Sequence, residues 1–479
     1  MEWYQAIVCV LQNGHRSVLL TPGDGQSEDR WQLPAFFPAT EAYNTNFPAT
    51  SEALQQQLGI ARVCIRYAVR LSNVGSPLNV YVAEPLRERT ASSGDGSRWF
   101  SVEDLSTLHF SSPIQGELLL AWLRDIAGNA NIDLLPWWRE GWIGEAENRI
   151  HVILRTDKRT RHPDTEQLRG AYTSAVLRTE TDRETVYLKA VAPPFQHEAR
   201  LTKVLSAEYP DQLPVILNAS EIENTRTNCP EMLMTDVGGE PVGSHSALST
   251  WTETVHRYAV IQSDSVGRIE SFLKSGCVDL RVATLRNRLS RFPSRLQSAL
   301  KGSPAGLTET EWGRLDTLLP QFQKGLERLA GVGLPDCLEH GDLHVGNLRW
   351  ISAKKTPVFL DWSHACITFP FYGYGTLLLD DDWFGPDAQT ASARVEWAYL
   401  SPWAAYAGAE KLAGAFVVWK PLRHLFIAER QIEIIASFQT LWADANQGAG
   451  TPCGDALRQL QWWLRDAARQ LLAAHKNFH

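Results

Sequence analysis

One loop near position 340 constrains the fold of this chain more than any other stretch. Residues 340–350 read His-Gly-Asp-Leu-His-Val-Gly-Asn-Leu-Arg-Trp, which places Asp342 and Asn347 five positions apart. A second carboxylate, Asp361, follows the apolar run 358–360, so it is predicted to lie where a buried strand ends. We expect these three oxygen-bearing side chains to line one cleft.

The spacing of these residues suits phosphoryl transfer. In that chemistry one carboxylate accepts the proton of the attacking hydroxyl, while an amide oxygen and a second carboxylate hold Mg²⁺ against the phosphates. The kinase catalytic loop H-R-D-L-x-x-x-N, followed by the aspartate of D-F-G, has the same Asp-to-Asn spacing. We therefore predict Asp342 as the catalytic base and Asn347 and Asp361 as metal ligands. His340 is assigned a structural role, as a hydrogen-bonded loop histidine.

The two motifs resemble those of the aminoglycoside phosphotransferase and choline kinase-like family of small-molecule kinases. Members carry H-G-D-x-H-x-x-N and I-D-W, which are matched at 340–347 and, with leucine in first position, at 360–362. The resemblance implies a bilobal protein-kinase-like fold, ATP and Mg²⁺ as cofactors, and a small hydroxylated molecule as acceptor. Aminoglycosides, amino alcohols, sugars and homoserine-like metabolites are all compatible with it.

Composition indicates an ordinary globular protein. The 479 residues exceed a single core and suggest two to three domains, with 44% apolar and 21% charged residues. The net charge of −8 disfavours a broad nucleic-acid surface. Seven scattered cysteines without a C-x-x-C pair favour reduced thiols, and neither a signal peptide nor an apolar run of about 18 residues is visible. We expect a cytoplasmic protein that binds neither nucleic acid nor membranes.

Residues 1–128 are predicted to form a small α+β domain. The order of their elements resembles a Nudix hydrolase domain, whose box of glutamates binds a metal. Aligning that box on Gly59-Ile60 places the two metal glutamates on Gln56 and Gln57. Glutamine offers a neutral oxygen where the metal prefers carboxylate charge, so we expect a degenerate, non-catalytic Nudix-like α/β/α domain. The expected strands are 6–11, 16–20 (around an Asn-Gly turn), 63–71 and 78–83, and the expected helices are 51–58 and 113–125.

Residues 129–240 are predicted to form a nucleotide-binding lobe with a lead-in helix. Strands at 175–179 and 185–190 follow a small-residue turn in which Ser174 is the expected hydroxyl donor to a phosphate. Val186-Tyr187-Leu188-Lys189 fits the V-A-I-K pattern, whose lysine contacts the α- and β-phosphates. An isolated lysine at a strand end is more often simply exposed, but its place before an acidic helix favours the functional interpretation.

Two further segments complete the predicted nucleotide site. Glu198, on a helix expected over 196–207, is predicted to pair with Lys189; the alternative is an ordinary glutamate favoured by the helix dipole. A strand at 232–236 runs into a Gly-Gly pair and is the expected hinge. There the backbone of Met234, Thr235 and Asp236 would contact the adenine edge, as the resemblance implies.

Residues 241–479 are predicted to form a helical catalytic lobe. The triplet Asp380-Asp381-Asp382 is either a solvated loop or the rim of a site for a cationic acceptor. Relatives usually place an aspartate shortly after the proline equivalent to Pro370, whereas here the nearest carboxylate is Asp380. Helices are expected over 250–276, 285–300, 307–329, 391–407 (interrupted at Pro402), 422–442 and 456–474.

Two other functions fit part of this pattern. A protein kinase is disfavoured because Gly341 replaces the arginine of H-R-D and no Ala-Pro-Glu segment follows. A regulatory pseudokinase that only binds nucleotide is disfavoured because Lys189 and the three loop residues are intact. The sequence therefore predicts an ATP- and Mg²⁺-dependent phosphotransferase that acts on a small-molecule hydroxyl.

Overall fold

A computed structural model of the chain divides into two compact units. The first comprises Met1–Pro193, Ile222–Leu233 and Thr440–Leu457, and the second comprises Pro194–Glu221, Met234–Gln439 and Arg458–His479. The structure describes residues 6–12, 17–23, 30–36, 47–58, 63–71, 78–85, 96–113, 115–117, 119–120, 135–219, 229–303, 306–378, 388–445, 447 and 451–474.

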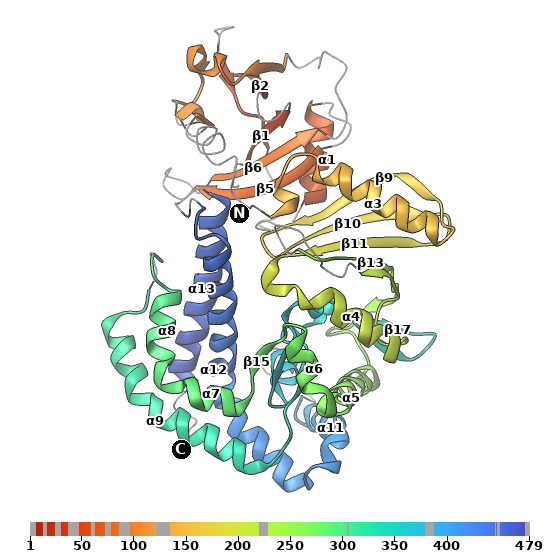
Figure 1. The fold of residues 1–479 in the computed structure, drawn as a ribbon, viewed down its shortest axis with the longest axis vertical. Coiled ribbons are helices and arrows are strands. Elements are labelled where there is room, and N and C mark those ends of the chain that lie inside the picture. The colour runs from red at the N-terminus through yellow and green to blue at the C-terminus, as the bar shows by residue number, and fades with distance from the viewer. Residues whose placement is uncertain are drawn as a thin grey trace. The chain divides into compact units, whose positions relative to one another are not determined.

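The first unit begins with an eight-stranded mixed sheet of order β5-β6-β1-β2-β3-β8, in which β4 pairs with β1 and β7 with β2 (Figure 1). β1 and β2 form the predicted antiparallel hairpin, with Leu11 opposite Val18. Apolar side chains at alternate positions, including Val8 and Val10, fill the core of this sheet. The bounds are β1 (Ala6–Gln12), β2 (Ser17–Pro22), β3 (Arg30–Gln32), β4 (Ala35–Phe36), helix α1 (Phe47–Leu58), β5 (Val63–Leu71), β6 (Leu78–Pro85), β7 (Arg98–Ser101), η1 (Asp104–Thr107) and β8 (His109–Phe110).

Strands β13, β11, β10 and β9 lie in that order in a second sheet, whose full order is β12-β13-β11-β10-β9. Helix α3 precedes it in the chain and buries an apolar stripe that includes Trp142, Ile150 and Leu154. β10 is antiparallel to both of its neighbours, and Val176 lies opposite Lys189 on β11. The bounds are η2 (Pro136–Trp138), α3 (Trp142–Thr156), β9 (Arg161–Gly170), β10 (Ser174–Thr181), β11 (Thr185–Val191) and β13 (Glu231–Thr235).

Polar contacts join these two sheets within the first unit. The Gln167 side chain on β9 accepts a hydrogen bond from Ile65 N and donates one to Ile65 O, both at 2.8 Å. A register shift beside Ile65 makes Arg66 the extra residue of a bulge on β5, and its guanidinium donates to Trp138 O at 2.8 Å. Gly141 N also donates to Glu84 Oε1 at 3.0 Å. Residues on both sides of position 128 therefore pack against one another.

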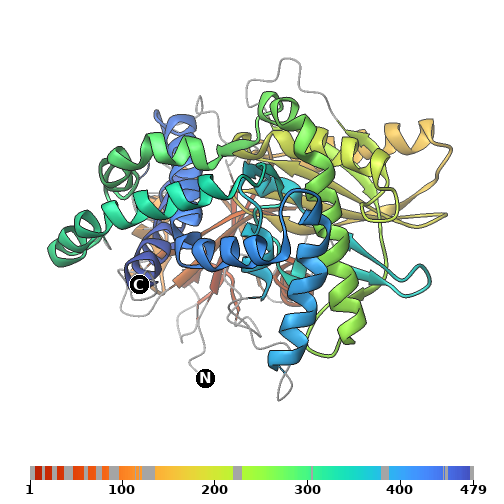
Figure 2. The same cartoon turned by 90° about the horizontal axis from the view of Figure 1, so that it is seen from below.

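The second unit is mainly helical, and α5 and α11 lie side by side in it (Figures 1 and 2). The bounds of its helices are η3 (Pro193–Phe195), α4 (His197–Glu208), α5 (Leu248–Ser265), η4 (Val266–Arg268), α6 (Ile269–Lys274), α7 (Val282–Arg288), η5 (Leu289–Arg291), α8 (Phe292–Ala299), α9 (Glu309–Val332), η6 (Val345–Asn347), η7 (Trp362–His364), α10 (Tyr372–Leu378), α11 (Ala388–Leu400), η9 (Ser401–Ala405), α12 (Ala409–Leu441) and α13 (Pro452–Ala474).

Several predicted helix boundaries were wrong. The helix expected over 285–300 is divided into α7, η5 and α8, because Pro293 in the first turn of α8 has no N–H to donate to Leu289 O in η5. The helix expected over 250–276 ends at Ser265 and continues as η4 and α6. Conversely, α12 begins at Ala409 instead of 422 and runs through a buried Pro421.

Short strands frame the predicted catalytic loop in this unit. One three-stranded sheet has the order β14-β17-β18 and the other the order β15-β19-β16. Strand β12 also belongs to this unit. The bounds are β12 (Ile216–Ala219), β14 (Glu240–Pro241), β15 (Val278–Leu280), β16 (Cys337–Glu339), β17 (Leu348–Ile351), β18 (Thr356–Phe359) and β19 (Cys366–Thr368).

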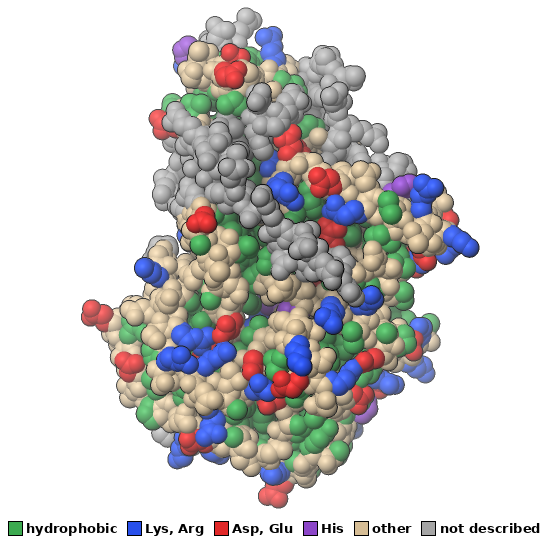
Figure 3. Space-filling view, viewed as in Figure 1, with side chains coloured by type: hydrophobic (Ala, Val, Ile, Leu, Met, Phe, Trp, Pro, Cys, Tyr) green, Lys and Arg blue, Asp and Glu red, His purple; other side chains and the backbone are tan. Residues whose placement is uncertain are grey.

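The surface carries charged side chains of both signs, and the cysteines are not paired in disulfides. Lysine and arginine side chains alternate with aspartate and glutamate side chains on the face shown in Figure 3. All seven cysteines carry free thiols, and six of them are buried. Across the described residues, no helix combines the length and the apolar character that a membrane crossing requires.

Candidate active site

The pairing of β17 with β18 brings the predicted loop residues together within the second unit. In the β17–β18 hairpin, Leu348 lies opposite Phe359, and the ladder extends by one hydrogen bond from Leu360 N to Asn347 O at 2.9 Å. Asn347 is therefore next to the residue that precedes Asp361. The register of this hairpin is what places the two predicted metal ligands at one end of it.

The side chain of Asn347 also holds the loop that carries Asp342. Its amide nitrogen donates to Asp342 O at 2.9 Å. Because the nitrogen is used inside the loop, the amide oxygen is the atom that is left to bind a metal ion. One asparagine thus fixes the predicted base and presents a neutral oxygen ligand.

Asp361 has an uncommon backbone conformation for a residue other than glycine. Its φ is 62°, in the left-handed region, which costs about 1–3 kcal/mol and is found most often at functional sites. Oδ1 accepts hydrogen bonds from Ser363 Oγ at 2.5 Å and from Ser363 N at 3.4 Å. The carboxylate is therefore oriented by the turn that follows it.

His340 ties the two segments to each other. Its Nε2 lies 2.8 Å from Leu360 O, and its Nδ1 accepts a hydrogen bond from Asp342 N at 3.3 Å. Burial lowers the pKa of His340, so the ring is neutral, with Nε2 as the donor and Nδ1 as the acceptor. The ring packs on Trp362, with the ring centroids 4.8 Å apart. The structural role predicted for this histidine is confirmed.

Gly341 occupies a position where a side chain does not fit. Its φ is 78°, and a Cβ atom there would lie 1.9 Å from His364 O and 3.0 Å from Arg430 Nη1. The loop can therefore approach the turn after Asp361 only with glycine at this position. This explains physically why the arginine of H-R-D is replaced here.

Asp342 stays ionised although burial opposes its charge. Burial raises the pKa of this carboxyl, but the positive charge of His364 and Arg430 outweighs it, so the pKa lies below its usual range. Asp361 is close enough for its charge to act in the opposite direction. The Asp342 side chain is 43% exposed, so a substrate hydroxyl can reach it. An ionised, accessible carboxylate is what a general base requires.

A buried polar network supports the loop from below, and sequence patterns did not reveal it. Glu339 is fully buried and accepts hydrogen bonds from Tyr258 OH and, at 2.8 Å, from Gln262 Nε2. Gln262 in turn accepts from Tyr399 OH at 2.8 Å. Burial raises the pKa of Glu339. Gln262 interrupts the apolar stripe of α5, and that interruption was the only signal of the network.

Helix α4 contacts the turn that follows Asp361. The fully buried ring of His197 lies against the backbone of Trp362 and Ser363. Burial lowers the pKa of His197 to about 4, so this ring is neutral as well. Sequence reasoning missed this contact, because a histidine beside the predicted Glu198 carries no motif of its own.

The predicted nucleotide residues are divided between the two units. In the first unit, Ser174 and Lys189 are buried, and Val176 lies two residues after Ser174 and opposite Lys189. Side chains alternate along a strand, so Ser174 and Lys189 are on the same face of the sheet. Glu198, in the second unit, is buried in the first turn of α4. The pairing of Lys189 with Glu198 stays a prediction.

The predicted hinge lies at the end of β13. Met234 and Thr235 are its last two residues, and Thr235 N donates to Val215 O at 3.0 Å. Asp236 follows the strand, and its Oδ1 accepts from Gly238 N at 3.1 Å. The acidic triplet 380–382 lies outside the described residues.

The oxygen atoms of Asn347 and Asp361 suit a cation that is held mainly by phosphates and water. Among the described residues, no group of three or more His, Cys, Asp or Glu side chains gathers where one metal ion could bind. Asn347 and Asp361 offer one amide oxygen and one carboxylate. Mg²⁺ is typically bound by one or two carboxylates together with substrate phosphates and water, so these residues fit it.

Comparison with known proteins gives one family and several solved structures. A model described as phosphotransferase enzyme family matches residues 164–412. The GDP complex of aminoglycoside 2'-phosphotransferase-IIIa aligns with 69% of this chain and 98% of its own, at 14% identity and a TM-score of 0.43.

Two other solved structures align over a similar span. A putative aminoglycoside phosphotransferase from Ralstonia eutropha JMP134 aligns with 69% of this chain and 98% of its own, at 12% identity and a TM-score of 0.42. Macrolide 2'-phosphotransferase type I aligns with 68% of this chain and 97% of its own, at 13% identity and a TM-score of 0.38. No curated protein matches the chain.

Proposed function

Because the chain belongs to the phosphotransferase enzyme family, we propose that it transfers the γ-phosphoryl group of ATP to a hydroxyl of a small molecule, with Mg²⁺ as cofactor. The observation that carries this proposal is the register of the β17–β18 hairpin. It brings Asn347 beside the residue before Asp361, while the Asn347 amide holds the backbone of Asp342. A base and two oxygen ligands then belong to one loop system.

The proposed chemistry is a single displacement. The acceptor oxygen forms a bond to the γ-phosphorus while the bond from that phosphorus to the β–γ bridging oxygen breaks. The proton of the acceptor hydroxyl passes to the Asp342 carboxylate, and ADP leaves. Asn347 and Asp361 would hold Mg²⁺, which neutralises phosphate charge when bound. Positioning and charge supply most of the rate in such reactions.

The proposal also assigns a role to each predicted nucleotide-binding residue. Lys189 contacts the α- and β-phosphates, Ser174 on the same sheet face donates its hydroxyl, and Glu198 orients Lys189. The backbone of residues 234–236 binds the adenine edge. The lobes are 129–240 and 241–479. The position of Ser174 and Lys189 on one face of the sheet supports this assignment.

The N-terminal region, residues 1–128, is proposed to be a Nudix-like domain without hydrolase activity. It acts as a scaffold for the nucleotide-binding sheet. Support comes from the paired hydrogen bonds between Ile65 and Gln167, which connect the two sheets.

The seven free thiols favour a reducing compartment such as the cytoplasm.

An ADP-release screen with the full chain, ATP and Mg²⁺ tests the proposed function. The acceptor panel should contain aminoglycosides, amino alcohols, sugars and hydroxy acids. We expect at least one acceptor to stimulate ADP release above the rate in its absence, and Asp342→Asn to remove that stimulation. No stimulation by any compound, with ATP nevertheless bound, would instead indicate a protein that only senses nucleotide.

A further inference from the structure

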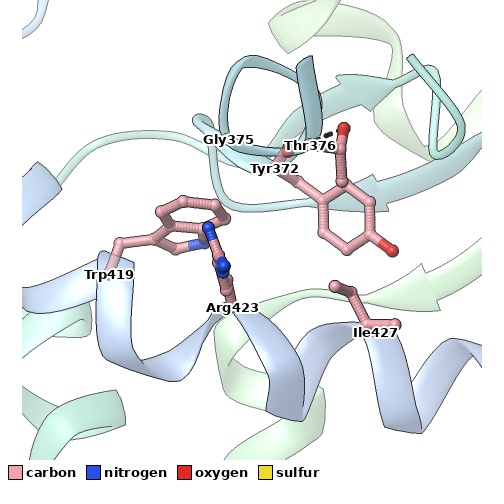
Figure 4. A pocket seen from close by; sticks show the side chains of 6 residues that line it. All are labelled: Tyr372, Gly375, Thr376, Trp419, Arg423 and Ile427. Atoms are coloured by element: carbon pink, nitrogen blue, oxygen red, sulfur yellow. Dashed lines mark hydrogen bonds between the residues drawn. The ribbon is translucent and has the colours of Figure 1, made fainter. Parts of the chain in front are cut away.

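Two adjacent tryptophans in the middle of α13 face solvent. Trp462 and Trp463 are 48% and 49% exposed, and their ring centroids lie 5.0 Å apart in an edge-to-face arrangement. Several other tryptophans of the second unit lie in its core. Trp419 of α12, for example, is 1% exposed and faces α10 (Figure 4). A pair of large exposed rings on one helix is therefore a candidate contact surface.

The opposite face of α13 already packs within the second unit. Leu460, Leu464 and Leu471 are buried there, as the apolar stripe of an amphipathic helix should be. Gln461 Nε2 also donates to Ala299 O, at the end of α8, at 3.0 Å. One face thus fixes the helix in the fold, and the side with the two tryptophans is left for another contact.

Polar residues are placed symmetrically about Trp462 on the solvent side of the helix. Arg458 and Asp466 are four residues before and after it, which is about 6 Å along the axis and about 40° around it to opposite sides. Gln459 and Arg465 are three residues before and after it. The guanidinium carbon of Arg465 lies 6.0 Å from the centroid of the Trp462 ring. An apolar centre with a polar rim is the usual composition of a protein interface.

This symmetry makes the face complementary to a second copy of itself. If two copies of α13 pack antiparallel about a two-fold axis through Trp462, each Asp466 lies opposite Arg458 of the other copy. Each Arg465 then lies opposite Gln459 of the other copy. A parallel arrangement would instead oppose like charges at both positions, which is unfavourable. The sequence of this face therefore selects both the partner and its direction.

The carboxylate of Asp466 is available for such a contact. It accepts a hydrogen bond from Gln470 Nε2 at 2.7 Å. Within the part of the chain that the structure describes, no cationic side chain forms an ion pair with it. An arginine of a second copy would supply that charge.

We propose that the solvent face of α13 is a homodimer interface, in which two copies of the chain pair antiparallel through Trp462 with an Asp466–Arg458 ion pair on each side. One helix face from each copy is a small interface, so the dimer should be weak and its population should depend on concentration. The inference does not rest on the proposed phosphotransferase activity, so the two can be tested separately.

Sedimentation velocity of the full chain from about 1 to 200 µM tests whether the dimer forms. We expect a monomer–dimer equilibrium. Trp462→Ser should raise its dissociation constant at least about tenfold, because this ring lies at the centre of the interface. Trp397→Ser, which removes a tryptophan that is 58% exposed on α11, is the matched control and should leave the dissociation constant unchanged. A chain that stays monomeric, or a dimer that Trp462→Ser weakens no more than Trp397→Ser does, would overturn the inference.

Two charge reversals test the antiparallel pairing itself. Asp466→Arg makes both positions cationic and Arg458→Asp makes both anionic, so each variant alone should dimerise at least about tenfold more weakly than the wild type. In an equal mixture, every pair joins opposite charges again, and we expect a heterodimer about as stable as the wild-type dimer. Mixing does not repair a damaged fold, so recovery would be specific to the pairing. A mixture that stays monomeric would contradict the proposed interface.

A membrane surface is the alternative occupant of this face, because exposed tryptophans also bind at lipid headgroups. We expect the wild-type chain not to sediment with vesicles of phosphatidylcholine and phosphatidylserine. A monomer that sediments with these vesicles, and no longer does so after Trp462→Ser, would assign the face to a membrane and overturn the homodimer.

Discussion

Helix α1 carries the degenerate Nudix positions, and the β17–β18 hairpin region carries the predicted phosphotransferase motif. The two regions differ in backbone strain and in the burial of their polar side chains. On α1, Gln56 is exposed and donates to Glu52 one turn earlier, at 3.1 Å, as surface residues of a helix commonly do. In the hairpin region, Gly341 and Asp361 have positive φ values and Glu339 is fully buried. Strain and buried polar groups are costly and persist only where surrounding contacts hold them. That contrast is why the chemistry is proposed for the hairpin region and not for α1.

Removal of the base should give the largest effect of any single change. Asp342→Asn retains the shape of the side chain but cannot accept a proton, so turnover should fall by about 10²–10⁴-fold. ATP affinity, measured by calorimetry, should change little, because this side chain is not proposed to hold the metal. Wild-type turnover in this variant would show that the hairpin is not the catalytic region.

The glycine of the loop should be almost as sensitive. Gly341→Ala places a Cβ against His364 O and also puts an alanine at a positive φ. We expect the free energy of unfolding to fall by about 1–3 kcal/mol and most of the turnover to be lost. Gly333, at φ 73° with open space around it, is the matched control. Gly333→Ala should lower the free energy of unfolding by only the cost of a positive φ, about 1–2 kcal/mol, and should leave turnover unchanged. Similar turnover in both variants would refute the steric argument.

Acid should destabilise the catalytic region through the buried histidine of α4. The pKa of His197 falls from 6.5 to about 4 on folding, so between these values the unfolded chain binds more protons and stability decreases as pH falls. We expect urea titrations to show a loss of about 1–3 kcal/mol between pH 7 and pH 5. His197→Gln should flatten that slope. An unchanged slope would mean that other groups cause the pH dependence.

The smallest effect is expected at the degenerate Nudix positions. Gln56→Ala and Gln57→Ala should leave phosphotransferase turnover within about twofold, because neither glutamine belongs to the proposed phosphotransferase site and neither supplies carboxylate charge to a metal. Nucleoside diphosphate hydrolysis should be absent in the wild-type chain with Mg²⁺. Hydrolysis that either substitution abolishes would reverse the comparison between the two regions.

Sequence patterns predicted the loop better than its surroundings. Residues 340–347 and Asp361 are close in the chain, so motif spacing was enough to expect them together. Glu339 is supported by Tyr258 and Gln262, about 80 residues away, and the sequence near Glu339 does not reveal such long-range polar packing. Arg430 lies still further along, in the middle of an apolar helix.

Helix boundaries failed for a different reason. A helix was expected to begin at 422, directly after Pro421, yet Pro421 lies within α12 because tertiary packing on both sides outweighs one lost hydrogen bond. Gly276 was the expected end of a single helix, although α5 ends at Ser265 and is followed by η4 and α6. Hydrophobic spacing detects a helical region well and its interruptions poorly.

Metal-dependent ATP binding by Asp361→Asn is the most direct test of the central claim. Asparagine tolerates the positive φ and retains an oxygen for Ser363, so this change removes the charge and little else. In calorimetry, Mg²⁺ should strengthen ATP binding to the wild-type chain and have little effect on the variant. If Mg²⁺ strengthens ATP binding equally in both proteins, Asp361 is not a metal ligand and the proposed active site is wrong.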